Sequence, residues 1–296
     1  NLQPSVAPAE HNFLGTIKYN TGHFAEALQH LNLCFEGACE TGQIVTAVTA
    51  AVNAGNTYVG LNDHEAALEW LNKGLDLARA HSWPLTLGPC LRQIGEIMRI
   101  MGRLDVAQAQ LNEALQVFAP LQNSRNFGLV LAALGDLALD QGDFDRARTL
   151  FAEKIARAKA MGQIDQEIEG QLGLARALMG VQRMDEAQFA VSRALTLAQG
   201  QGATVLVISA LRLLAQLHRA WGRREESLMY LEQALSAARS IVGYLLPGEL
   251  LLELAGEYAH VGRFEEAYQT AVAAGQARER VLTQDAANRA TAMQVR

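Results

Sequence analysis

The 296-residue chain has little proline, few aromatic residues and few cysteines. Six residues are proline, and aromatic residues make up 6% of the chain while apolar residues make up 50%. A chain this rich in aliphatic residues can bury a large core, but it lacks the aromatic strand segments of an all-β sandwich. Its three cysteines, an odd number without a CxxC spacing, predict no disulfide framework. We therefore expect a reducing, cytoplasmic environment.

Basic charge and long apolar runs are also scarce. The 25 Lys and Arg residues against 31 Asp and Glu give a formal net charge of −6, which argues against nucleic acid or an anionic membrane as a partner. No uninterrupted apolar run reaches the roughly 18 residues of a membrane-spanning helix, and residues 1–10 lack the features of a signal peptide. Because no initiator Met is present, we expect the sequence to be a piece of a longer protein.

Internal repetition is the main positive feature of the sequence. A column of small residues recurs every 40 residues at Ala27, Ala67, Ala107, Ala147, Ala187, Ser227 and Ala267. A second column in the same phase is small throughout: Gly15, Gly55, Gly95, Gly135, Ala175, Ala215 and Ala255. Such columns predict close helix crossings, where enlarging Gly95 to Leu would overpack and cost about 1–3 kcal/mol. Seven repeats of this length cover nearly the whole chain.

Each repeat has the apolar spacing of two helices. In the second repeat we predict helices over Ile44–Gly60 and His64–Ala80, joined by a tight turn at residues 61–63. Five of the corresponding turns carry glycine, and Asn62 and Gln182 replace it in the other two. Neither helix of a pair can bury its apolar stripe alone, so the pairs must stack into an all-α solenoid. We divide the chain into an array of seven repeats over residues 1–282 and a C-terminal segment over residues 283–296.

The repeats resemble a known family in several short motifs. These include Leu14-Gly15 with Tyr19, Gly22-His23-Phe24-Ala25-Glu26-Ala27, Gly142-Asp143-Phe144-Asp145-Arg146-Ala147 and Gly262-Arg263-Phe264-Glu265-Glu266-Ala267. They are similar to tetratricopeptide repeats, although that family's usual unit is 34 residues. The resemblance implies a right-handed superhelix in which the first helix of each pair lines a concave groove that binds proteins or peptides. Longer units of this kind resemble those of bacterial regulatory and scaffold proteins.

A search for catalytic, metal and cofactor sites finds none. Gly200-Gln201-Gly202 lacks the preceding strand and third glycine of a nucleotide loop, and it falls at a predicted turn between repeats. The seven histidines are scattered without metal-ligand spacing. His218 stands in a packing column and is expected to be a buried interface residue. We therefore expect a chain that is not itself an enzyme, uses no cofactor and binds no metal.

The predicted groove is read from the positions equivalent to 12, 16 and 19 in each repeat. Five of these 21 positions are arginine and two are acidic, which gives the groove a formal charge of +3. This pattern predicts an anionic ligand, such as an acidic peptide, a carboxylate or a phosphate. The alternative is that the arginines pair with Glu96, Asp136 and Glu169 on neighbouring helices. The candidate ligand-binding residues are Asn56, Arg92, Glu96, Arg99, Asp136, Arg176, Met179, Arg212, Gln216 and Arg219.

The C-terminal segment departs from the repeat. Gly275 interrupts a column of large apolar residues, and residues 264–296 read either as one long helix or as a helix followed by a capping helix that begins near Thr283 or Asp285. The last residues resemble the linker that follows tetratricopeptide arrays in bacterial signalling proteins. That resemblance implies an output domain, most familiarly a diguanylate cyclase, less often a histidine kinase. Two alternatives stay open: a ligand or peptide sensor attached to a DNA-binding output, and a free-standing scaffold. We also expect homodimerisation through the C-terminal helix.

Overall fold

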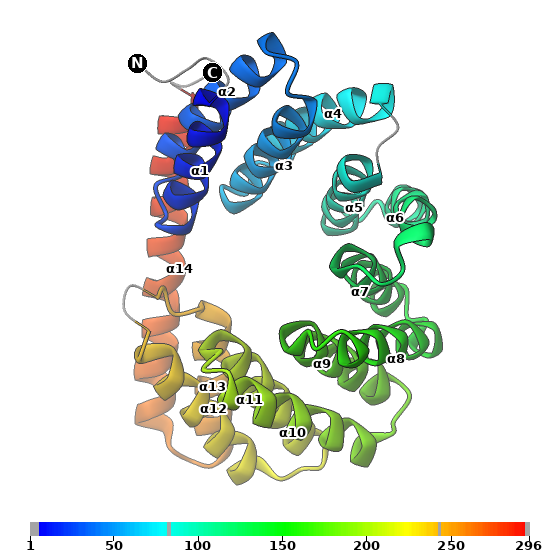
Figure 1. The fold of residues 1–296 in the computed structure, drawn as a ribbon. Helices are drawn as coiled ribbons and strands as arrows, with labels where there is room; N and C mark the ends of the chain where they lie inside the picture. Colours follow the sequence, from blue (N-terminus) through cyan, green and yellow to red (C-terminus); the bar gives the residue numbers. More distant parts are fainter. Residues whose placement is uncertain (1–5, 82–83, 242–243, 294–296) are drawn as a thin grey trace. The chain divides into compact units, whose positions relative to one another are not determined.

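The computed structural model describes residues 6–81, 84–241 and 244–293, and within them every regular element is helical. Figure 1 shows the elements in chain order, α-helices plus the short 3₁₀ helix η1. Their bounds are α1 Ala7–Asn20, α2 Phe24–Glu40, α3 Ile44–Gly60, α4 His64–His81, α5 Pro84–Ile100, α6 Leu104–Phe118, η1 Ala119–Leu121, α7 Arg125–Asp140, α8 Phe144–Ala160, α9 Ile164–Gly180, α10 Met184–Gly200, α11 Thr204–Ala220, α12 Arg224–Arg239, α13 Gly248–His260 and α14 Phe264–Met293. The all-α fold of consecutive helix pairs is confirmed, and α3 and α4 match their predicted bounds to within one residue.

The turns inside the helix pairs lie where the sequence predicted them, and they have a left-handed backbone. Gly22, Gly102, Gly142, Gly222 and Gly262 have φ between 74° and 82°. Asn62 (φ 54°) and Gln182 (φ 61°) adopt the same conformation without being glycine. Each turn therefore ends one helix and starts its partner after only three residues, which keeps the two helices antiparallel and adjacent.

The small columns mark the places where the helices of a pair cross. A Cβ atom built on Gly15, Gly55 or Gly95 would lie 2.8 Å, 2.7 Å or 2.6 Å from the Cγ of Leu31, Leu71 or Leu111. Since real Cβ atoms do not approach this closely, only glycine fits at these crossings. This confirms the structural reading of the small columns.

The chain forms two compact units, residues 1–133 together with 283–296, and residues 134–282. In the first unit α3 contacts both α1 and α5, and in the second unit α9 contacts α11. The first helices of successive pairs therefore lie side by side within a unit. Near the end of α14, the Arg289 Nε donates a hydrogen bond to the Leu61 carbonyl of the first unit at 2.9 Å.

The C-terminal segment is one helix as far as the structure describes it. α14 runs from Phe264 to Met293, 30 residues, whereas the helices of the second unit that precede it have 13 to 17. The sequence left one helix or two open, and no second helix begins at Thr283 or Asp285.

Candidate binding surface

The predicted groove positions lie on the first helices of the pairs. We call the following ten residues of the second unit, which include acidic residues that pair with the groove positions, the A-helix face: Asp136, Arg176, Met179, Arg212, Gln216, Arg219, Leu252, Glu253, Gly256 and Glu257. They lie on α7, α9, α11 and α13. Met179, Gln216 and Arg219 are half-buried, and Arg176 is exposed. The repeat of 40 residues brings these side chains to equivalent places on consecutive helices.

Two arginines of this face bind carboxylates on the neighbouring first helix. Arg176 Nη2 on α9 lies 2.9 Å from Asp136 Oδ1 on α7. Arg212 on α11 meets Glu253 on α13 with two bonds, from Nη2 at 2.8 Å and from Nε at 3.1 Å. Hydrogen bonding to Glu253 raises the pKa of Arg212, so its charge is fixed. Each pair joins residues about one repeat apart and so connects one helix pair to the next.

A third contact, made by α11, α12 and α13, buries the carboxylate of Glu257 between two arginines. Glu257 is 1% exposed, and its Oε1 accepts from Arg219 Nε at 2.5 Å and from Arg224 Nη1 at 3.0 Å. Its Oε2 is buried and has no hydrogen-bond partner among the described residues. Because a buried carboxylate needs cationic partners, Arg219 and Arg224 are both required to offset the burial of Glu257.

The corresponding positions of the first unit are arranged differently. Arg92 donates to both oxygens of Glu96 at 2.7 Å, a pair within α5 itself. Between helices, Asn53 Nδ2 donates to Asn12 Oδ1 at 3.0 Å. Asn56 and Arg99 are half-buried on α3 and α5. At these positions the unit therefore shows a neutral amide contact between two first helices and an ion pair within one helix.

Arg212 and Arg219 pair with acidic residues that the prediction did not count. Glu253 and Glu257 fall one position to the side of the 12, 16 and 19 columns. A signal existed for Glu257, since the equivalent positions in the other repeats are Ile17, Thr57, Ile97, Leu137, Ala177 and Leu217. An acidic residue in an otherwise uncharged column indicates a buried partner. Of the three acidic residues suggested as partners on neighbouring helices, Asp136 pairs with Arg176 of α9, Glu96 pairs with Arg92 of its own helix, and Glu169 accepts from Lys154 Nζ at 2.9 Å.

The A-helix face also has an open position and an exposed apolar side chain on α13. Gly256 lies in the middle of α13, and a Cβ built on it would meet no atom within 4 Å. Its glycine is thus not required by packing within the chain, although glycine costs a helix about 1 kcal/mol relative to alanine. Leu252, one turn earlier, is 39% exposed. The face therefore combines paired charges with open and apolar positions.

Two cysteines and His218 are buried in the packing of the helices. Burial raises the pKa of the Cys34 thiol to about 11 and that of Cys90 to about 12, so both stay protonated at neutral pH. His218 is buried against Trp221 and Tyr230, with ring centroids 5.4 Å and 5.1 Å away, which confirms its packing role. In the described ranges no group of three or more His, Cys, Asp or Glu residues could hold a metal ion. Likewise, none of the described helices is long and apolar enough to span a membrane.

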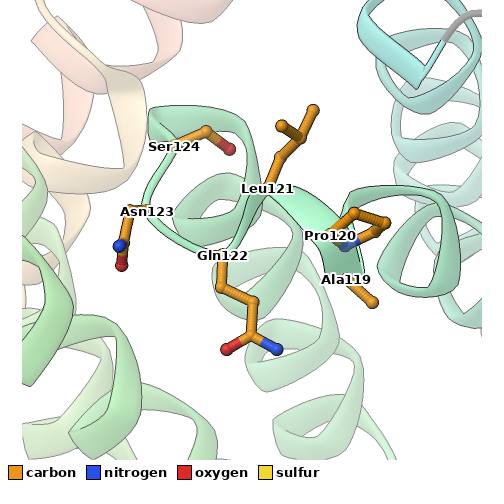
Figure 2. A pocket seen from close by; sticks show the side chains of 6 residues that line it. All are labelled: Ala119, Pro120, Leu121, Gln122, Asn123 and Ser124. Atoms are coloured by element: carbon orange, nitrogen blue, oxygen red, sulfur yellow. The ribbon is translucent and has the colours of Figure 1, made fainter.

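A hollow of about 410 Å³ in the first unit is formed by the loop between α6 and α7. Figure 2 shows its lining residues, where Leu121 and Gln122 point in different directions and no charged side chain is present. Ser124 caps α7 by accepting a hydrogen bond from the Phe127 amide at 3.3 Å. The loop thus has a local structural role, and the hollow lacks the converging polar groups of a ligand site.

Comparison with known proteins identifies the repeats. Models of the tetratricopeptide repeat match residues 48–81 and 167–240. No curated protein sequence matches the chain significantly.

Several solved structures share the fold at low sequence identity. A Rap protein complexed with competence and sporulation factor has a TM-score of 0.72 at 15% identity, over 96% of this chain and 78% of that one. The apo quorum sensor NprR from B. thuringiensis has a TM-score of 0.68 at 16% identity, over 93% and 77%. The Rap conjugation gene regulator of plasmid pLS20, in complex with the Phr* peptide, has a TM-score of 0.62 at 16% identity, over 92% and 74%. The chain therefore contains tetratricopeptide repeats at residues 48–81 and 167–240, and it shares the fold of these neighbours.

Proposed function

We propose that the chain is a non-enzymatic regulatory array that binds a protein or peptide partner on the A-helix face of its second unit. The observation that carries this proposal is the combination of ion-paired arginines with the open position at Gly256 on one row of helices. A row of first helices presents side chains at a regular spacing, which suits an extended or helical peptide. The Phr* peptide bound by the pLS20 regulator, a protein of the same fold, supports a peptide partner.

The charges of the face define the partner's chemistry. An anionic ligand must compete with Asp136 and Glu253 for the guanidinium groups that they already hold. Arg176 is the most accessible of the three face arginines, with 49% of its side chain exposed, against 29% for Arg212 and 34% for Arg219. We propose that Arg176 meets an acidic group of the partner while Met179 and Leu252 contact its apolar side chains.

Selection from a random peptide display library, followed by calorimetric titration of the selected peptide, tests this proposal. Arg176→Glu reverses the accessible charge, and Gly256→Trp fills the open position; each is expected to weaken binding at least tenfold. The control is Arg183→Glu, because Arg183 is also ion-paired, with Glu186, and 43% exposed but lies outside the face. Unchanged affinity in both face variants would contradict the proposal.

We further propose that α14 connects the array to an output domain, of which a diguanylate cyclase is the preferred candidate. The length of α14 favours this proposal, because its 30 residues form one continuous helix that is longer than each of the helices before it. The alternatives are a DNA-binding output and a free-standing scaffold. Sequencing the gene downstream of the codon for Arg296 separates them: a cyclase domain supports the proposal, a helix-turn-helix domain replaces it, and a stop codon directly after Arg296 rejects it.

A further inference from the structure

One side of α14 carries a stripe of solvent-exposed residues. Phe264, Tyr268 and Leu282 are 71%, 72% and 68% exposed. Ala271, Gly275 and Arg278 complete the stripe and are also exposed. The six positions are spaced by four and three residues alternately, so they form one seam along the helix, the spacing that lets two helices pack along their length.

Equivalent positions on another second helix of this unit are covered. On α8, a Cβ built on Gly180 of the following α9 would lie 2.3 Å from the Cδ1 of Phe144. In the same way, Gly173 approaches Phe151, and Gly170 approaches Ile155. Phe264, Ala271 and Gly275 of α14 are the equivalents, three repeats later, of Phe144, Phe151 and Ile155 of α8. The stripe is therefore a helix-binding surface by the standard of the chain's own packing.

Gly275 supports a close approach by another helix. It lies inside α14, where glycine is unfavourable, and a Cβ built on it would meet no atom within 4 Å. Nothing within the described chain needs a glycine there. An incoming helix backbone would need it, as Gly170 and Gly173 of α9 show for the contact with α8.

We propose that the occupant of this surface is α14 of a second copy, packed antiparallel about a two-fold axis near Ala273. Positions equally far from residue 273 then face each other. Phe264 meets the second copy's Leu282, Tyr268 meets Arg278, and Ala271 meets Gly275. Large residues thus lie at the two ends of the contact and small residues at its centre, so the stripe is complementary to itself, as a two-fold interface requires.

The pairs at the ends are chemically matched. Leu282 lines a pocket of about 550 Å³ together with Leu245, Pro247 and Val281, and this pocket lies opposite the exposed ring of Phe264 in the second copy. Arg278 stands at the rim, 3.9 Å from Glu249 at the limit of an ion pair. In the dimer the Arg278 guanidinium lies over the ring of the second copy's Tyr268 and forms a cation–π contact. Glu265 of the second copy lies one helical turn before that Tyr268. The chain already makes such a contact between Arg263 and Tyr258.

Sedimentation equilibrium of the full chain tests the occupant. We expect a mass twice the 32.1 kDa of one chain, and we expect Phe264→Asp and Gly275→Leu to give the mass of one chain. The control is Phe189→Asp, which changes an equally exposed phenylalanine (77%) on α10 and should leave the dimer intact. Circular dichroism establishes that each variant is folded. A single-chain mass for the unmodified protein, or a dimer that persists in both stripe variants, overturns the proposal.

Disulfide crosslinking tests the direction of the pairing. Cys39 is exposed and is first replaced by serine, while Cys34 and Cys90 are buried. Val272→Cys then places a thiol beside the axis, and we expect a covalent dimer under mild oxidation. Phe264→Cys places the two thiols about 27 Å apart in the antiparallel arrangement, at about 1.5 Å of rise for each of 18 residues, so it should not crosslink. Efficient crosslinking through position 264 would show parallel pairing and contradict the arrangement.

Discussion

Arginines on the first helices of the two units find their carboxylates in different places. In the second unit, Arg176 and Arg212 each reach a carboxylate on the adjacent helix, and Glu257 is buried between two arginines. In the first unit, Arg92 pairs within its own helix. An arginine-rich column therefore does not by itself define a free basic surface, because the role of each guanidinium depends on which helix supplies its carboxylate.

The largest effect is expected where the carboxylate is most buried. Replacing Arg219 and Arg224 together by Met leaves Glu257 without a cationic partner, and we expect a loss of about 3 kcal/mol in the free energy of unfolding. Urea denaturation of the double variant measures it. Adding Glu257→Leu should recover most of the loss, since the buried charge is then removed as well. A double variant that unfolds at the same urea concentration as the parent would contradict this description of the contact.

A smaller loss is expected at the two-bond contact between α11 and α13. Arg212→Met removes both hydrogen bonds to Glu253, and because the pair is partly exposed we expect a cost of about 1–2 kcal/mol. The same urea measurement applies, at low and high salt. Since the pair is shielded from solvent on one side, salt should reduce the difference only in part. If high salt removed the stability difference between Arg212→Met and the parent completely, the contact would behave as a solvent-exposed ion pair, and this description of it would be wrong.

Acid should weaken the second unit through His218. Burial lowers the pKa of His218 below its ordinary value of 6.5, and the facing charges of Glu226 and Arg223 raise and lower it respectively. The folded state therefore binds fewer protons than the unfolded state just below pH 6.5, so stability falls as the pH drops through this range and levels off below the folded pKa. Thermal unfolding followed from pH 7.5 to 5 should show a shallower decline for His218→Phe than for the parent. An identical decline in both would remove His218 as a contributor.

The smallest effect is expected at the pair within one helix. Arg92→Met breaks an i,i+4 pair with Glu96, which stabilises a helix by about 0.3–0.5 kcal/mol. Its urea midpoint should therefore change less than that of Arg212→Met. A larger change at Arg92 would show that this arginine joins helices as those of the second unit do.

Much of the fold followed from the sequence because its determinants are local. The 40-residue period, the helices over Ile44–Gly60 and from His64, and the left-handed turns at Asn62 and Gln182 all depend on residues close in the chain. The continuous course of α14 could not be decided, because no glycine or proline marks a stop near Thr283 and solvent-exposed helix ends carry little pattern. The candidate site could be predicted only in part, since Glu253 and Glu257 reach the arginines from the next repeat, outside the columns that define the predicted groove.

Hydrogen–deuterium exchange of the full chain with a library-selected peptide tests the central claim, that the partner binds the A-helix face of the second unit. We predict slower exchange in fragments from α9, α11 and α13, and little change in α8, α10 and α12. Slower exchange confined to the second helices of the pairs, or to the first unit, would contradict it.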